Sequence, residues 1–493
     1  MDLSNNTSIS EKINRGEPVS LSFTYPSEPI IRSLNSLFAK ILSKLDMIYM
    51  IDTTITILRE IIINAFKANA KRVYFEKNSI DITDPSSYQE GISRFKNEVV
   101  GNLDFIEADM KSSRYNVIIT IKNMDKGLQI LVTNNTPILP EELERIRLRM
   151  ARAREYNDFS DAYEEVYDST EGAGLGIVLV TLLLKNSGVD LDTYQINSDG
   201  KVTRCQLLIP FQLRPIEIVT NIKKQIIEQV MGLPTFPEHI IELQRMCNDP
   251  DSSISVISKK IMIDPSLTSD VIKLSNSASF ITNKRVENVN EAVMNIGLNN
   301  LNMILTASSA RRILDKRFSK FEQVWNHCNK VATYTSIIAT KLKIAKVMEN
   351  AFISGLLHDL GKIVLLSTNL ELTNRVADIV NNRKIRTSTV LEEISIGISH
   401  STIGEMIAQK WNFPEYLTEA IKYHHSPLCA KKEYEDLVNI TYLANMLCGI
   451  ENRKYDYYYI EEEILKKYNL PNLDDFNKFH EDIQNSFNSS NSQ

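Results

Sequence analysis

The hydrophobic pattern of this chain changes part-way along, and the change limits what the chain can fold into. Alternation of apolar and polar residues, which is typical of strands, is confined to the part before residue 210. From Leu233 onward, apolar residues recur at spacings of three and four, as they do along helix faces. The 493 residues are enough for about two to four domains. We therefore expect a multidomain chain with an α/β domain first and an all-α domain after it.

Five segments are expected from periodicity and composition. They are a flexible tail over residues 1–20, an α/β domain over 21–213, a helical linker over 214–232, a helical domain over 233–455 and a polar tail over 456–493. The C-terminal tail is expected to form a short helix and then to become disordered. Within the α/β domain we expect helices over 34–48, 51–70, 141–155 and 177–185, an irregular polar insertion over 77–114, and strands over 72–76, 116–122, 127–133, 191–196 and 203–209. The linker helix is expected to transmit a state between domains, to pair with a copy of itself in a homodimer, or simply to connect.

Charge and cysteine content exclude some classes of protein. A net charge of −6 and a pI near 5.8 give no reason to expect direct nucleic-acid binding. The five cysteines are widely spaced with no Cys-x-x-Cys, which favours reduced thiols. The longest apolar run, Gly176 to Leu184, is too short to span a bilayer, and the first residues are too polar for a signal peptide. We expect a cytoplasmic protein that does not enter a membrane.

Three polar residues on the second predicted helix form one candidate site. Glu60, Asn64 and Lys67 are spaced at i, i+4 and i+7, which places them on one helix face. That face offers a base, an amide oxygen for hydrated Mg²⁺ and a cation for phosphate. The alternative is a solvated polar stripe on an amphipathic helix.

A glycine-rich turn precedes the apolar helix predicted over 177–185. Gly172, Gly174 and Gly176 are spaced as Gly-x-Gly-x-Gly. Glycines let backbone N–H groups approach a phosphate at a helix N-terminus, where the helix dipole favours an anion. The spacing is neither the dinucleotide fingerprint nor the GxxxxGK[ST] loop. The alternative is a close crossing of a helix and a strand.

Residues 30–210 resemble the GHKL ATPase fold of histidine kinases, anti-sigma kinases, gyrase and MutL-type proteins. Glu60, Asn64 and Lys67 match the family's Glu-x-x-x-Asn-x-x-Lys helix, and the glycine turn matches the second glycine motif of its ATP lid. The resemblance implies an α/β sandwich with a mixed sheet and helices on one face. It also implies ATP and Mg²⁺ as cofactors, with Asn64 on Mg²⁺, Glu60 as base or water-orienting group, and Gly172 to Gly176 around the phosphates.

The middle motif of that family is replaced in this chain. Where the family usually has Asp-x-Gly-x-Gly, this sequence has Asn134-Asn135-Thr136-Pro137-Ile138. The family's aspartate accepts a hydrogen bond from the adenine amine, and Asn134 would accept it through an uncharged amide oxygen. The first histidine is His239, so no phosphoacceptor histidine is expected ahead of the ATPase-like domain. ATP would then phosphorylate a partner or act as a conformational ligand.

The histidines gather in the second half of the chain. Five of the seven lie between residues 327 and 425. His358 is followed by Asp359, and Gly361 would permit the bend that lets the two side chains converge on one ion. Imidazole nitrogen with carboxylate oxygen suits Fe, Mn, Zn or Ni. The alternative is a set of buried histidines that only support helix packing.

Residues 226–450 resemble the HDOD family, the HD-related output domain of bacterial signalling proteins. The order of Leu233-Pro234-Thr235-Phe236-Pro237, Asp264-Pro265 and Trp325-Asn326-His327 carries the resemblance. It implies an all-helical fold, with the HD-like part at about 318–450, and most members are regarded as non-catalytic output modules.

Parent HD hydrolases bind metal through His…His-Asp…Asp, and this chain retains most of that pattern. The ligands that the resemblance implies are His327, His358, Asp359, His400, His424 and His425. The closing aspartate is replaced by Asn445, and no Gly-Tyr-Pro follows His425, so cyclic di-GMP specificity is not implied. Lys362 matches the HD-family lysine near the phosphate, or else caps a helix.

Three functions remain open from the sequence. The first is a signal-transduction regulator in which an ATP-binding module is coupled to an HDOD module that contacts signalling proteins. The second is a metal-dependent phosphohydrolase or phosphodiesterase acting on a nucleotide or phosphoester, with Lys362 stabilising phosphate charge. The third is a non-catalytic interaction scaffold, since each site has an asparagine in place of an aspartate. Whether the chain is an enzyme, as a weak ATPase or kinase or as a phosphohydrolase, is left open.

Overall fold

The chain forms two compact units, Met1–Ile218 and Val219–Gln493. The structure is a computed structural model. It describes residues 9, 12–13, 15–45, 47–82, 84–100, 103–156, 174–213, 221–276, 286–318, 321–382, 385, 387–452 and 454–491.

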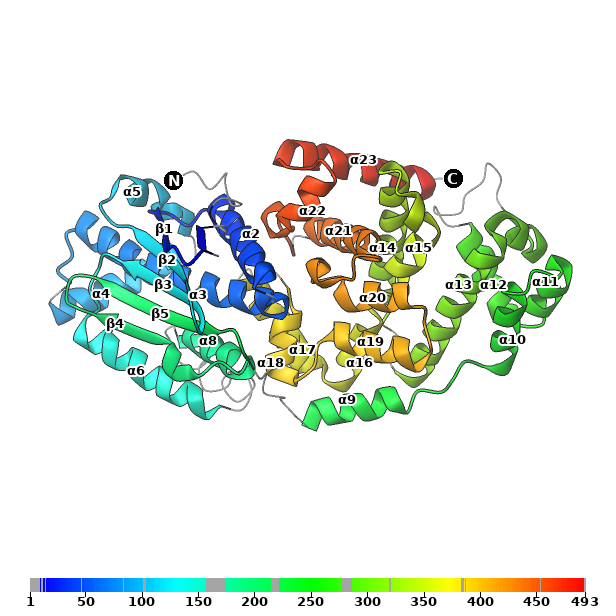
Figure 1. Ribbon diagram of the computed structural model, residues 1–493, viewed down its shortest axis with the longest axis horizontal. Helices are drawn as coiled ribbons and strands as arrows, with labels where there is room; N and C mark the ends of the chain where they lie inside the picture. The colour runs from blue at the N-terminus through cyan, green and yellow to red at the C-terminus, as the bar shows by residue number, and fades with distance from the viewer. Residues whose placement is uncertain are drawn as a thin grey trace. The chain divides into compact units, whose positions relative to one another are not determined.

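A five-stranded sheet is the framework of the N-terminal unit (Figure 1). Its strands, in spatial order, are β1 (Val19–Phe23), β2 (Val117–Met124), β3 (Gly127–Asn134), β5 (Thr203–Pro210) and β4 (Gln195–Ser198). The predicted mixed sheet is wrong, because every neighbouring pair is antiparallel. β3 and β4 both pair with β5 and not with each other, so the described strands include no parallel pair. The predicted tail over 1–20 is also wrong at its end, since β1 begins at Val19 and pairs with β2.

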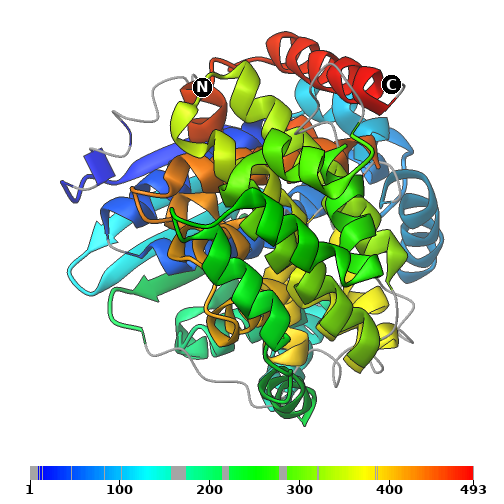
Figure 2. The same ribbon diagram turned by 90° about the vertical axis from the view of Figure 1, so that its right-hand side faces the viewer.

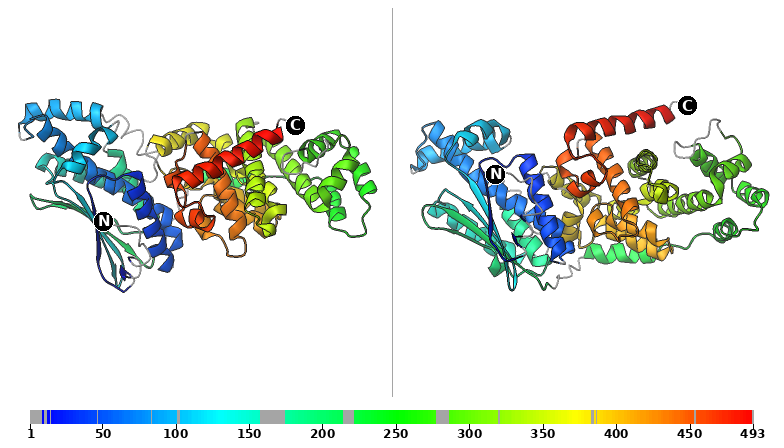
Figure 3. Two further views of the ribbon diagram at one scale, coloured as in Figure 1. Left: turned by 90° about the horizontal axis from the view of Figure 1, so that it is seen from above. Right: turned by 45° about the horizontal axis from the view of Figure 1, so that its top comes forward.

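One face of this sheet is covered by helices. Val117, Ile119 and Ile121 of β2 are fully buried, while the residues between them are only partly so, which is the alternation of a sheet with one covered face. The covering helices include α2 (Glu28–Lys44), α3 (Ile51–Lys77) and α8 (Gly174–Asn186) (Figure 3). α3 packs against β3 and α8, and α6 (Pro140–Glu155) packs against α8. The predicted helices over 141–155 and 177–185 are confirmed.

Two further predictions in this unit are wrong. Residues 72–76 are not a strand but the last turns of α3, where Val73, Tyr74 and Phe75 are buried by neighbouring helices. The segment predicted as irregular contains helices α4 (Pro85–Phe95) and α5 (Glu107–Ser112) and a π-helical turn between them. Aromatic packing explains why this polar stretch is ordered: the rings of Phe75 and Tyr88 lie 5.9 Å apart, and those of Tyr74 and Phe95 lie 5.6 Å apart.

The C-terminal unit contains only helices among its described residues (Figure 2). They are α9 (Asn221–Met231), α10 (Glu238–Cys247), α11 (Ile254–Met262), α12 (Pro265–Ser275), α13 (Val289–Arg317), α14 (Glu322–Lys341), α15 (Met348–Leu357), α16 (Leu360–Thr368), α17 (Leu370–Asn382), α18 (Thr389–Ile396), α19 (His400–Lys410), α20 (Glu415–Tyr423), α21 (Glu435–Glu451), α22 (Glu462–Lys467) and α23 (Leu473–Asn491). The predicted all-α character is confirmed.

The ends of this unit differ from the predicted linker and tail. α9 is not a free connector, because Ile226 and Val230 are fully buried against the helical core. The supposed polar tail contains α22 and α23, and Phe476 and Ile483 of α23 are buried in a second core beside α14. The apolar residues of these helices recur at helical spacing among many asparagines. The prediction of a polar tail relied on composition and did not use this spacing.

The junction of α15 and α16 lies within the most apolar segment of the unit. Among the described residues, Ala345–Thr368 is the one stretch long and apolar enough to cross a membrane, yet 78% of its apolar window is buried inside the protein. The bend falls at His358 and Asp359 and not at Gly361, which lies inside α16. Gly361 has a different role: a Cβ there would overlap the carbonyl oxygen of His400, so α16 and α19 can cross closely only with glycine.

A half-buried carboxylate, Glu451, ties α23 to the rest of the helical unit. Glu451 accepts hydrogen bonds from Tyr334 Oη (2.7 Å) and His480 Nε2 (2.8 Å), and it pairs with Lys330. Burial raises the pKa of Glu451, but these donors outweigh burial and lower it from 4.5 to about 2.

The pH dependence of stability should therefore change in the Glu451→Gln variant. Because the folded pKa is depressed, the stabilisation is complete above about pH 4.5 and is lost as the pH falls toward 2. We expect the free-energy difference between wild type and variant to shrink over that window. Urea denaturation followed by tryptophan fluorescence measures it, since Trp325 and Trp411, the two tryptophans of the chain, both lie buried in this unit. A Glu481→Gln control, at an exposed site of α23, should leave the slope unchanged, and a wild-type slope in Glu451→Gln would contradict the assignment.

Candidate metal centre

The predicted metal-ligating residues come from four places in the helical unit and meet in one cluster. His327 lies on α14, His358 and Asp359 at the α15–α16 junction, His400 at the start of α19, and His424 and His425 directly after α20. They form two groups that share the aspartate: His327, His358 and Asp359 in one, and Asp359, His400, His424 and His425 in the other. Within each group the ligand atoms all lie within 4.8 Å of one another.

Asp359 occupies the middle of the cluster and presents one oxygen to each group. Its Oδ1 lies 3.4 Å from His400 Nε2 and 3.3 Å from His424 Nε2. Its Oδ2 lies 3.4 Å from His358 Nε2 and 3.6 Å from His327 Nε2. Lys362 Nζ donates to the same Oδ2 at 2.7 Å. A single carboxylate would therefore offer one oxygen to an ion held by either group.

The hydrogen bonds of three imidazoles fix which nitrogen faces the aspartate. Nδ1 of His358 donates to Gly355 O and Nδ1 of His424 donates to Ile421 O, each at 2.7 Å. Nδ1 of His400 donates to Glu392 Oε2, also at 2.7 Å. All three partners only accept hydrogen bonds, so in the neutral rings each Nε2 carries a lone pair.

Those lone pairs converge on one another and on the carboxylate. Nε2 of His400 and Nε2 of His424 face each other at 3.3 Å, and both face Asp359 Oδ1. His358 Nε2, His425 Nε2 and Asp359 Oδ1 are buried with no hydrogen-bond partner. Burial lowers the pKa of His424 to about 3, so near neutral pH this ring does not supply the missing proton. A set of buried acceptors of this kind fits a cation, and the N and O donors fit a transition metal.

The negative charge of Asp359 is offset by its neighbours. Burial acts to raise the pKa of Asp359, but His358 and Lys362 outweigh it and hold that pKa well below its usual range. Burial lowers the pKa of His327 to about 3 despite the attraction of Asp359. Burial likewise lowers the pKa of His424 and of His425, so the centre presents an ionised carboxylate beside three imidazoles, His327, His424 and His425, that are uncharged near neutral pH.

Glu392 on α18 contacts the histidine cluster, and the sequence did not reveal it. It is 3% exposed and accepts from both the Nδ1 and the backbone N–H of His400, at 2.7 and 2.8 Å. Burial raises its pKa, but these bonds to His400 outweigh burial and lower it. A carboxylate behind an imidazole fixes the ring and raises its basicity toward a metal. No spacing rule links residue 392 to 400, so only the three-dimensional structure reveals the pair.

Asn445 on α21 lies where the sequence predicts it, at the edge of the first group. Its Oδ1 is 3.1 Å from His327 Nε2, and its Nδ2 is buried without a partner. The neutral amide orients His327 but brings no charge to the site.

The residues predicted to bind nucleotide lie on adjacent helices of the N-terminal unit. Glu60 is buried on α3, while Asn64 and Lys67 are half-buried on the same helix face. Gly174 and Gly176 form the start of α8, which packs against α3. Gly172 lies outside the described residues.

Asn134, at the end of β3, is held in a buried polar network. Its Nδ2 donates to Thr136 Oγ1 at 2.5 Å and to Asn69 Oδ1 at 3.3 Å. Its N–H groups are therefore directed to Asn69 and Thr136, and its Oδ1 is the atom that a base amine would address.

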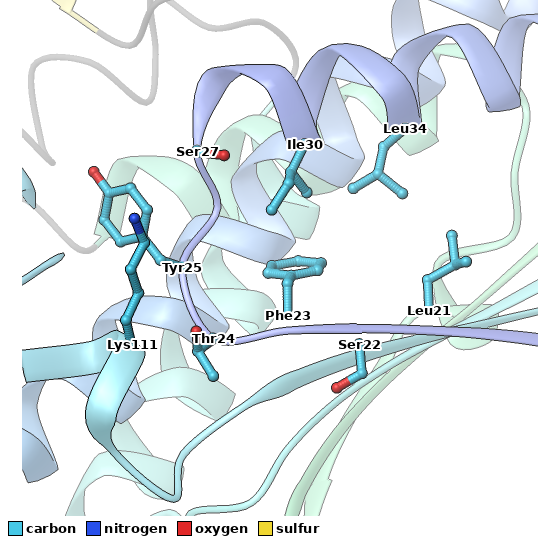
Figure 4. A pocket seen from close by; sticks show the side chains of 9 residues that line it. All are labelled: Leu21, Ser22, Phe23, Thr24, Tyr25, Ser27, Ile30, Leu34 and Lys111. Atoms are coloured by element: carbon cyan, nitrogen blue, oxygen red, sulfur yellow. The ribbon is translucent and has the colours of Figure 1, made fainter. Parts of the chain in front are cut away.

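A separate hollow of about 250 Å³ lies between β1 and α2 (Figure 4). Apolar side chains, including Phe23 and Leu34, line most of it, and Lys111 closes one side. None of the predicted nucleotide-binding residues is among its lining residues.

Two sequence comparisons find similarity between this chain and known proteins. The family model of the HDOD domain matches residues 233–427. An uncharacterised protein of Treponema pallidum (strain Nichols) is 31% identical over 434 residues, which cover 87% of this chain and 84% of that protein. Residues 233–427 are an HDOD domain. The match ends at residue 427, so Asn445 and the last helices lie beyond it.

Solved structures also resemble part of the chain. An HDOD domain protein of unknown function from Geobacter sulfurreducens is 24% identical, covering 47% of this chain and 78% of that one, with a TM-score of 0.40. A protein from Shewanella amazonensis SB2B, described provisionally as a metal-dependent phosphohydrolase, is 18% identical, covering 55% of this chain and 99% of that one, with a TM-score of 0.40. Both TM-scores are below 0.5, so the HDOD assignment rests on the sequence match.

Metal content should depend on the cluster. We expect purified protein to carry about one or two transition-metal ions per chain, and His358→Ala to lose more than half of them, because a buried Nε2 ligand is removed. Elemental analysis by mass spectrometry measures this. His239→Ala is the matched control, since His239 lies outside the cluster with a side chain that is 53% exposed. Equal metal content in both variants would contradict the site.

Proposed function

We propose that this HDOD protein is a metal-dependent phosphohydrolase whose centre is the cluster around Asp359. The observation that carries the proposal is the convergence of three imidazole Nε2 atoms, each fixed by a bond at Nδ1, on one buried carboxylate. A packing role does not require buried lone pairs to face one another, since such an arrangement costs free energy without a cation.

In this proposal the histidines and Asp359 bind metal, and Lys362 binds the phosphate of the substrate. His327 and His358 would hold an ion with Asp359 Oδ2, and His400, His424 and His425 would hold another with Oδ1. A bound ion of Fe, Mn, Zn or Ni would polarise a phosphoryl oxygen and lower the pKa of a bound water. Glu392 keeps the His400 ring in place, and Lys362 adds positive charge for the phosphate.

Hydrolysis of a chromogenic phosphoester tests the proposal. We expect Mn²⁺-loaded protein to release p-nitrophenol from p-nitrophenyl phosphate or its bis-ester. Asp359→Asn should lower kcat/KM by at least about 100-fold, since it removes the shared charged ligand. His239→Ala should retain wild-type activity. Metal-loaded wild type with no turnover of either ester would contradict the proposal.

Asn445→Asp is expected to have the opposite effect. A carboxylate in place of the amide at 3.1 Å from His327 adds a charged ligand at the first group, so metal occupancy there should rise and activity should not fall.

We infer a second function, nucleotide-dependent regulation, for the N-terminal unit. The observation behind it is that the face of α3 carrying Asn64 and Lys67 belongs to a helix that packs against α8, which begins at Gly174. Mg-ATP held there would act as a conformational ligand or phosphorylate a partner, and the partners would be signalling proteins or a second copy of the chain.

Calorimetry with Mg-ATP on the full-length protein tests this second function. We expect binding at sub-millimolar nucleotide that is weakened at least about tenfold in Asn64→Ala. Asn78→Ala, at the C-terminal end of the same helix, is the control, because its side chain only caps α3 through Tyr74 O. No heat at millimolar nucleotide would leave the N-terminal unit without this function.

A further inference from the structure

The residues of the metal centre differ in their exposure to solvent. The side chains of His358, Asp359, His400 and His424 are 0% exposed. Those of His327 and Lys362 are 26% and 29% exposed. A small anion would therefore reach the centre past His327 and Lys362.

The end of α21 brings a second pair of residues to this opening. Asn445, which contacts His327, and Gly449 are one helical turn apart and so share a face of α21. The ring of Tyr455 packs directly on Gly449, where a Cβ would overlap the ring. The backbone N–H of Lys454 donates to Gly449 O at 2.9 Å. These contacts hold residues 454 and 455 beside the turn of helix that follows Asn445.

The charges around the opening are mostly positive. Burial, together with the nearby charge of Lys362, lowers the pKa of Lys454, although the attraction of Asp359 opposes both. The carboxylates whose charge acts on Lys362 already have partners: Asp359 pairs with Lys362 itself at 2.7 Å, and Glu392 pairs with His400 at 2.7 Å.

We propose that Lys454, with Tyr455 beside it, forms with Lys362 an anion-binding entrance to the metal centre that selects the dianionic phosphate of a phosphomonoester. This inference rests on the proposed phosphohydrolase function and names its substrate class. Two ammonium groups at the accessible side match the two charges of a terminal phosphate, whereas a phosphodiester carries one. Lys454 and Tyr455 lie beyond the region matched by the family model, whereas Lys362 lies within it, so this side of the entrance comes from the chain's own C-terminal segment.

Phosphate binding by the full-length, Mn²⁺-loaded protein tests the entrance without requiring turnover. Calorimetric titration with inorganic phosphate should give binding to wild type that is weakened about tenfold in Lys454→Gln and restored in Lys454→Arg. Metal content should be the same in all three proteins, because Lys454 is not one of the candidate ligands. Lys478→Gln, an exposed lysine of α23, is the matched control for the change in net charge.

The outcomes separate this inference from the phosphohydrolase proposal. If phosphate binding depends on Lys454 but no ester is hydrolysed, the entrance is supported. Only the proposed phosphohydrolase reaction is then contradicted. Where esters are hydrolysed, Lys454→Gln should raise KM for p-nitrophenyl phosphate more than for its bis-ester, with kcat little changed. Equal phosphate affinity in wild type and Lys454→Gln, or no phosphate binding by metal-loaded wild type, would overturn the entrance.

Discussion

The convergence of imidazole lone pairs on Asp359 is the constraint on which the C-terminal unit depends. Three rings are locked by Nδ1 bonds to Gly355, Glu392 and Ile421, so each turns a bare nitrogen toward the same carboxylate. Left without a cation, buried acceptors at 3.3–3.4 Å repel one another. Lys362 donates a hydrogen bond to Asp359 Oδ2, whereas Asp359 Oδ1 has no donor.

Small residues in the surrounding helices make this convergence possible. A Cβ at Gly355 would meet the backbone of Ala332 at 2.6 Å, so glycine lets α15 lie close to α14, the helix that carries His327. Gly361 does the same for α16 and α19, the helix that begins with His400. Two close crossings thus bring histidines that are distant in sequence onto the His358–Asp359 junction. Packing and chemistry are linked here, because widening either crossing would separate the ligands.

Much of the site could be predicted from the sequence because the residues that form it are rare. Histidines are scarce in this chain, so their concentration between 327 and 425 is informative, and His358 beside Asp359 marks the centre. Glu392 could not be predicted, because glutamates are common and its link to His400 exists only through the approach of α18 and α19. The placement of Lys454 and Tyr455 could not be predicted for a similar reason. It depends on the packing of the Tyr455 ring on Gly449 and on no sequence motif.

Secondary structure was predicted correctly where the hydrophobic periodicity is strong. The prediction was wrong where burial in the folded protein outweighs local residue preference. The β2–β3 hairpin and helix α6 follow clear patterns, and the structure confirms them. Val73, Tyr74 and Phe75 suggest a strand by residue type, but they are buried at the end of a long helix, so tertiary packing prevails over propensity. The asparagine-rich C-terminal segment resembles a disordered tail in composition, yet Phe476, Phe479 and Ile483 anchor α23 to the core.

Anomalous diffraction from crystals of the Mn²⁺-soaked protein tests the central claim most directly. The account predicts anomalous peaks within coordination distance of Asp359, one between Oδ1 and the Nε2 atoms of His400 and His424, and a weaker one beside His358 and His327. Metal-free density at full soak concentration, with His400 and His424 turned so that their rings donate to Asp359, would contradict it.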